Sequence, residues 1–167
     1  MKRFNTGLLV LGLALAPLTA LAATQSMTAN IAFDTPLTLT KVSDVNFGTV
    51  SAGVADTYTI TTTGAVTAAG SGVVLYGTPT AGNISIAGSS SQTINISVGS
   101  FTANGGVTPQ NATCAYNGGA AGSCSITGAA APGGGKTLLL GVQAVVDGTQ
   151  AAGSTAAPTF TVTVVYG

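Results

Sequence analysis

The sequence contains no histidine, glutamate or tryptophan, and this removes most of the side chains that catalyse reactions or bind metals. Without histidine, neither a Ser-His-Asp nor a Cys-His arrangement can be built. Paired carboxylates would have to come from the four aspartates, which we expect to be turn and loop residues. We therefore expect no enzyme, no cofactor and no metal site. The aspartates are Asp34, Asp44, Asp56 and Asp147.

The sequence is also poor in charge, with four basic and four acidic residues among 167 and a formal net charge of zero. So weak a charge provides no electrostatic footprint for nucleic acid. The sequence also lacks the many charged residues that keep an ordinary cytosolic domain soluble. The surface must then consist largely of Thr, Ser, Asn and Gly, a composition common in exported β-proteins that stack against copies of themselves.

The first 22 residues have the features of a secretory signal peptide. Lys2 and Arg3 begin a segment that continues with an apolar run of about 15 residues and a small-x-small site at residues 20–22. The run is short for a membrane span and contains Pro17. We predict cleavage after Ala22, export, and no transmembrane segment in the mature chain.

Cys114 and Cys124 enclose a short Gly/Ala-rich loop, AYNGGAAGS. In an exported chain the default interpretation of such a pair is one local disulfide. A metal pair is the weaker interpretation, because histidine is absent and the sequence has no other thiol.

Two short motifs look like ligand-binding loops but lack the context that those loops need. Residues 130–137, AAPGGGKT, satisfy a loose P-loop pattern, yet a P-loop needs a helix after it and the following sequence favours a strand. Residues 44–48, DVNFG, resemble a calcium loop with far too few side-chain oxygens. We interpret the first as a flexible loop and the second as a turn that enters a strand through Phe47.

Beyond residue 22, short runs rich in Val, Ile and Thr alternate with Gly or Ser clusters. This spacing is typical of an all-β sandwich. We therefore predict a single antiparallel β-sandwich domain over residues 23–167, with Leu37, Leu39, Val45 and Phe47 as inward positions. Besides the strands at the two ends, strands are expected within 37–50 and at 56–63, 72–77, 82–88, 92–100 and 137–150.

The strands at the two ends have the clearest patterns, because each alternates an apolar face with a mainly polar one. The N-terminal strand, 26–34, has Met27, Ala29, Ile31 and Phe33 on one face, and the last has Phe160, Val162, Val164 and Tyr166. After Pro158 the last strand carries neither of the usual edge protections, charge or proline. Two interpretations stay open: the N-terminal strand complements a neighbouring copy, or it folds back and closes its own domain.

Three segments resemble the bacterial family known as domain of unknown function 4402: PLTLTKVSDVNFGTV, GNISIAGSSSQTINISV and AAGSTAAPTFTVTVVYG. The framing NFGTV…TFTVTVVY is similar, more distantly, to spore coat protein U and to archaic chaperone–usher pilins. This resemblance implies an immunoglobulin-like, pilin-like sandwich that polymerises by strand donation. Met27, Ala29, Ile31 and Phe33 would then be the donor residues, and Phe160, Val162, Val164 and Tyr166 would line the acceptor groove.

The expected function is that of an exported structural subunit of a fimbria-like surface fibre. The resemblance implies self-association into a polymer, a periplasmic chaperone and usher as partners, and passage through the periplasm to the cell surface. The alternative is a self-contained, monomeric secreted module that binds glycan or matrix, for which the cysteine loop offers one aromatic residue, Tyr116.

Overall fold

The computed structural model describes residues 23–167, and every helix or strand assigned within them is a β-strand. The predicted signal peptide, residues 1–22, lies outside the described residues. Residues Phe33–Gly167 form one compact unit. The strands are β1 Thr38–Ser43, β2 Thr49–Val50, β3 Ala55–Ile60, β4 Val66–Ala68, β5 Val74–Tyr76, β6 Gly82–Ala87, β7 Ile94–Thr102, β8 Val107–Tyr116, β9 Gly122–Ser123, β10 Ile126–Ala129, β11 Lys136–Asp147 and β12 Thr159–Tyr166.

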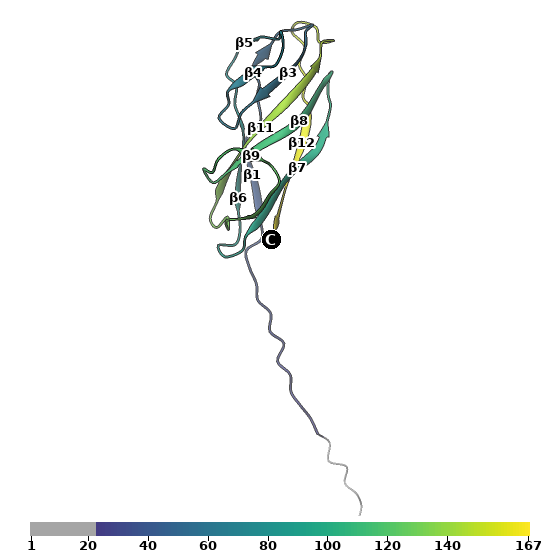
Figure 1. The fold of residues 1–167 in the computed structure, drawn as a ribbon. Coiled ribbons are helices and arrows are strands. Elements are labelled where there is room, and N and C mark those ends of the chain that lie inside the picture. Colours follow the sequence, from purple (N-terminus) through teal and green to yellow (C-terminus); the bar gives the residue numbers. More distant parts are fainter. Residues whose placement is uncertain (1–22) are drawn as a thin grey trace, which may run out of the picture. The chain divides into compact units, whose positions relative to one another are not determined.

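The larger sheet is organised around β11, the longest strand (Figure 1). One edge of β11 pairs first with β6 and then with β3, while its other edge pairs with β8. β1 extends this sheet beyond β6, β4 extends it beyond β3, and β9 adds a short strand to β8. The second sheet has the order β10-β7-β12, and β2 and β5 form a separate two-stranded ribbon. All the pairings are antiparallel.

The six main strands follow the order of an immunoglobulin-like sandwich. In that fold, strands A, B, E and D form one sheet, and C, F and G form the other. Here β1-β6-β11-β8 run in the A-B-E-D order, and β7-β12 in the C-F order. Within residues 23–167, no strand takes the position of G beside β12.

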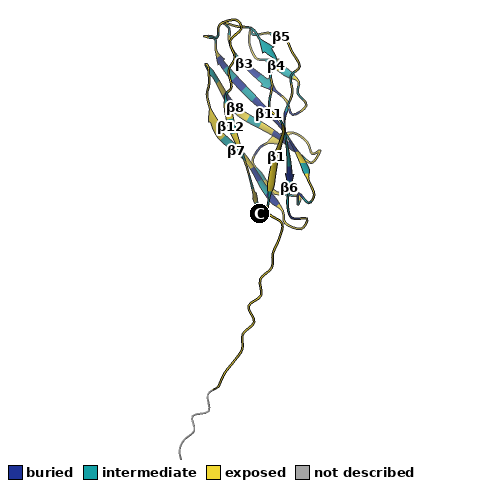
Figure 2. Cartoon of the chain, turned by 180° about the vertical axis from the view of Figure 1, so that it is seen from behind, coloured by how far each residue is buried: buried dark blue, intermediate teal, exposed yellow. Residues whose placement is uncertain are grey.

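The core fills the space between the two sheets, where alternate residues of facing strands meet (Figure 2). Its fully buried members include Ile86 on β6, Leu138 on β11, and Ile94 and Ile96 on β7. β6 and β7 alternate apolar with polar or small residues, so the burial of their isoleucines follows from the two-residue period that predicted these strands. β11 instead carries consecutive apolar residues. The all-β sandwich expected from the sequence is confirmed.

One long strand, β8, escaped prediction because its pattern is interrupted. Pro109 lies within it, and Asn111 has a positive φ of 49° at a register shift opposite β11. An extra residue of this kind changes the face to which the following side chains point. Proline is tolerated here because β9 pairs only with Thr113 and Cys114, which leaves the Pro109 end of β8 at a sheet edge.

We expect Gly141→Ala to destabilise the domain strongly. Gly141 lies where β11 passes from β6 to β3, and a Cβ atom there would lie 2.4 Å from the Ile60 carbonyl oxygen. Because that neighbour is backbone in a core strand, we expect a cost of about 1–3 kcal/mol or more in the free energy of unfolding. Urea unfolding followed by circular dichroism measures it.

Gly99→Ala is the matched control for this substitution. Gly99 lies in β7, and a Cβ atom at this position would meet nothing within 4 Å. Alanine should therefore be tolerated there. Equal destabilisation by the two substitutions would contradict the close approach of backbone at Gly141.

Candidate functional site

The main candidate site is the unpaired edge of β12. This strand pairs antiparallel with β7 from Thr159, opposite Thr102, to Tyr166, opposite Ile94, and has no partner strand on its other side within residues 23–167. An unpaired edge presents N–H and C=O groups that can extend the sheet with another strand. The edge carries no charged side chain along its eight residues.

The inward face of β12 contains the four residues predicted to line the acceptor groove: Phe160, Val162, Val164 and Tyr166. They alternate with exposed residues, are only half-buried, and pack against the core cluster. The ring of Phe160 also lies 6.0 Å from that of Phe101, which is 37% exposed. The predicted alternation is confirmed, whereas the acceptor role stays a prediction.

A second edge is left open at β1. Leu39 lies opposite Ile86, so the two side chains share one face of the sheet. Ile86 is fully buried, but Leu39 is 41% exposed. The prediction that Leu39 points inward is therefore correct for its face and wrong for its burial, because within residues 23–167 β1 pairs with β6 alone and lies at the edge of the larger sheet.

The N-terminal segment predicted as a donor strand forms no strand in the single chain. Residues 23–37 carry no strand, turn or bend. The side chains of Met27, Ile31 and Phe33 are 93%, 76% and 92% exposed, and Ala29 is exposed as well. We call residues 23–33 the arm. Nothing in a single chain tests its donor role, which stays a prediction.

A hydrogen-bonded cluster links the C-terminal end of β12 to the residues that follow the arm. The phenol oxygen of Tyr166 accepts a hydrogen bond from the Ser89 N–H (2.7 Å) and donates one to the Thr35 carbonyl. Ser89 Oγ donates to the carboxylate of Asp34 (2.7 Å). That bond and one from the Thr35 N–H lower the pKa of Asp34. We call these four residues the clasp.

The clasp was not found by sequence reasoning, which placed Tyr166 only in the acceptor groove. Residues 34, 89 and 166 are far apart in the chain, and Ser89 belongs to an ordinary serine run. Yet Ser89 is only 1% exposed. The one signal in the sequence was a tyrosine, with a polar hydroxyl, at an inward position of the last strand.

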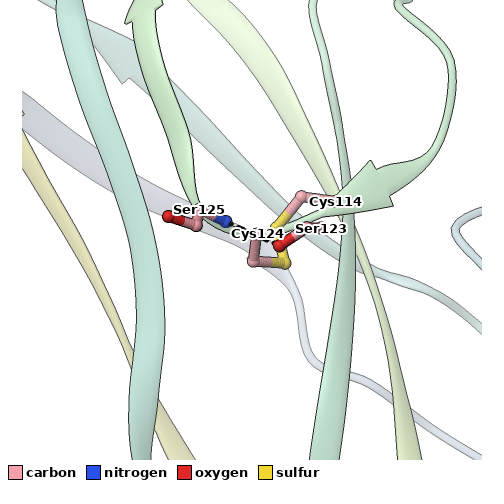
Figure 3. The surroundings of a disulfide bond; sticks show 4 residues. All are labelled: Cys114, Ser123, Cys124 and Ser125. Carbon is pink, nitrogen blue, oxygen red and sulfur yellow. Dashed lines mark hydrogen bonds between the residues drawn. A yellow bond between two sulfur atoms is a disulfide. The ribbon is translucent and has the colours of Figure 1, made fainter.

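The disulfide predicted between Cys114 and Cys124 is present, and both residues are buried (Figure 3). It joins β8 to the short segment that leads from β9 into β10. β10 in turn pairs with β7 of the second sheet. The bond therefore connects the two layers of the sandwich on the side away from β12.

A shallow cavity of about 400 Å³ lies beside the disulfide and is lined in part by Cys114, Tyr116, Ile126 and Ala129. Tyr116 is the residue that would serve the alternative of a glycan-binding module. Its O–H donates to the Ala130 carbonyl (3.0 Å), and burial raises its pKa. The hydroxyl is thus already engaged by the segment that follows β10.

The remaining aspartates are engaged by nearby groups. Asp44 forms an exposed ion pair with Lys41 (2.8 Å). Burial acts to raise the pKa of Asp56, but hydrogen bonds from N–H groups of the adjacent loop and strand outweigh burial, so this pKa lies below its usual value. Hydrogen bonds from Thr149 lower the pKa of Asp147. Asp56 is the second residue of β3 and Asp147 is the last residue of β11, so both lie at strand ends beside turns or loops. Among residues 23–167, no group of three potential ligands could hold a metal ion.

The P-loop-like segment, 130–137, leads directly into β11, which begins at Lys136, so a strand stands where a phosphate-binding helix would be needed. Among the described residues, no helix is long and apolar enough to cross a membrane.

No curated protein and no solved structure matches the chain. The model of one family matches residues 37–166, which covers both open edges and the disulfide. The chain therefore belongs to the family described as domain of unknown function (DUF4402).

Proposed function

We propose that the protein is an exported structural subunit of a fimbria-like surface fibre, in which the arm of one subunit pairs with the β12 edge of the next. The observation that carries the proposal is the position beside β12 that no strand of residues 23–167 fills, where an immunoglobulin-like sandwich has its seventh strand. A donated strand would form hydrogen bonds with the unpaired backbone N–H and C=O groups of β12 and cover its half-buried inward face.

The arm has the length and pattern that this position requires. Its 11 residues (23–33) can extend over about 36 Å, whereas the eight residues of β12 span about 26 Å. Met27, Ala29, Ile31 and Phe33 recur every second residue, so a paired arm would direct all four toward the core. Met27, Ile31 and Phe33 are exposed in the single chain, and burying each would contribute about 1.5–3 kcal/mol.

The cellular setting follows from the same proposal. A subunit with two open edges and an exposed apolar arm needs protection before it assembles, which suits a periplasmic chaperone and an usher. The buried disulfide is compatible with an oxidising compartment and thus with export. The subunit would pass through the periplasm and end at the cell surface.

A denaturing gel of the native surface fraction, with unboiled and boiled samples side by side, tests the proposal. Polymers held by donated strands should resist detergent until heated, because every subunit is locked by many buried contacts. We expect a ladder that collapses on boiling to one band near the mature mass. A single monomer band in both lanes would contradict the proposal and favour the monomeric module that binds glycan or matrix.

A further inference from the structure

The loop of residues 88–93 connects β6 to β7, and the directions of the two edge strands, β1 and β12, can be described relative to it. β1 is antiparallel to β6, so it runs away from this loop. β12 is antiparallel to β7, so it runs toward the loop and ends beside it, with Tyr166 opposite Ile94. The clasp forms at this end, because Ser89 belongs to the loop and Thr35 lies three residues before β1.

Pairing of the arm with its own β12 would therefore need a chain reversal. The arm would have to run along β12 toward the clasp, and the chain would then have to turn back within residues 34–37 to enter β1. A chain that reverses its direction between two sheets needs a turn or bend at the connection. The structure shows neither a turn nor a bend at residues 34–37, and both Asp34 and Thr35 are held by the clasp.

We propose that the clasp prevents the arm from closing its own sandwich and so reserves it for a second copy of this chain. This inference rests on the proposed function. Tyr166 is the central positioning residue, because its single hydroxyl joins the loop to the residues that follow the arm. Folding the arm back would break the bonds that hold Thr35 and Asp34, whereas donation to another copy would leave them intact.

The test compares Tyr166→Phe with Tyr116→Phe in the full-length mature chain. Both substitutions remove one tyrosine hydroxyl and keep the ring, but the Tyr116 hydroxyl bonds to the Ala130 carbonyl and forms no hydrogen bond with the residues of the clasp. Since each lost hydrogen bond shifts an equilibrium by roughly two- to tenfold, we expect Tyr166→Phe to lower the polymer fraction by about fivefold or more. Tyr116→Phe should polymerise like the wild type.

Hydrogen exchange of the arm separates a lost clasp from general damage. In the Tyr166→Phe monomer, amides of residues 27–33 should become protected, because the arm now pairs with its own β12. In the wild-type monomer they should exchange freely. Polymerisation of Tyr166→Phe at the wild-type level, or a monomeric arm that stays unprotected, would overturn the inference.

Gly88→Ala is a second variant for the case that Tyr166→Phe does not fold. A Cβ atom at residue 88 would lie 2.5 Å from the Tyr166 hydroxyl and 3.0 Å from the Leu37 side chain, so the hydroxyl must move. The same loss of polymer and protection of the arm are expected. Polymer at the wild-type level with an unprotected arm would count against the clasp.

A synthetic peptide of residues 23–33 distinguishes failure of the clasp from failure of the proposed function. The acceptor is the full-length Ile31→Asp subunit, whose own arm is disabled as a donor. Peptide binding together with wild-type behaviour of Tyr166→Phe would reject the clasp alone. Absence of peptide binding would reject strand donation, and the clasp inference with it.

Discussion

A subunit carrying Ile31→Asp is expected to fold and to be exported but to form no detergent-resistant polymer. Ile31 is 76% exposed in the single chain, so an aspartate there costs the subunit's own fold little. In the proposed fibre the same side chain lies between two sheets, where an unpaired carboxylate costs several kcal/mol. A cost of about 4 kcal/mol would weaken each subunit contact roughly a thousandfold.

Asn30→Asp is the matched control, since it introduces the same charge one residue away on the opposite face of the arm. Its carboxylate would face solvent in the fibre, and we expect the wild-type ladder on an unboiled gel. Circular dichroism of both purified subunits establishes that they fold. A normal ladder from Ile31→Asp subunits would show that the arm has been wrongly assigned as the donor.

Removal of the disulfide by the double substitution Cys114→Ala, Cys124→Ala is expected to destabilise the domain by about 2–5 kcal/mol. Both cysteines are buried, and alanine leaves no unpaired polar group behind. The bond holds the start of β10 against β8, so its loss also loosens the pairing of β10 with β7. The urea midpoint should fall by roughly 1–3 M.

Tyrosine fluorescence or circular dichroism can follow this unfolding, because the sequence has no tryptophan. Reductant provides the internal control. It should shift the wild type toward the double variant and leave the double variant unchanged. Equal midpoints for the oxidised wild type and the double variant would mean that the bond adds nothing to stability.

Several features of the fold were predictable because they depend on neighbours along the chain. The alternation of Phe160, Val162 and Val164 predicted β12 and its inward face, since a strand has a two-residue period wherever it lies. The ten-residue separation of the two cysteines predicted a local disulfide. Where the local pattern was broken, as by Pro109 in β8, prediction failed even for a strand that pairs along much of β11.

The sequence by itself determined the strand content, the apolar face of each end strand and the poverty of catalytic groups, because these properties reside in residue types and short spacings. Only the tertiary structure decided which edges stay open. The exposure of Leu39 and the position beside β12, unfilled in the described part of the chain, depend on the order of strands in two sheets. The clasp likewise depends on Asp34, Ser89 and Tyr166 meeting at one end of the sandwich, and no local pattern in the chain specifies that meeting.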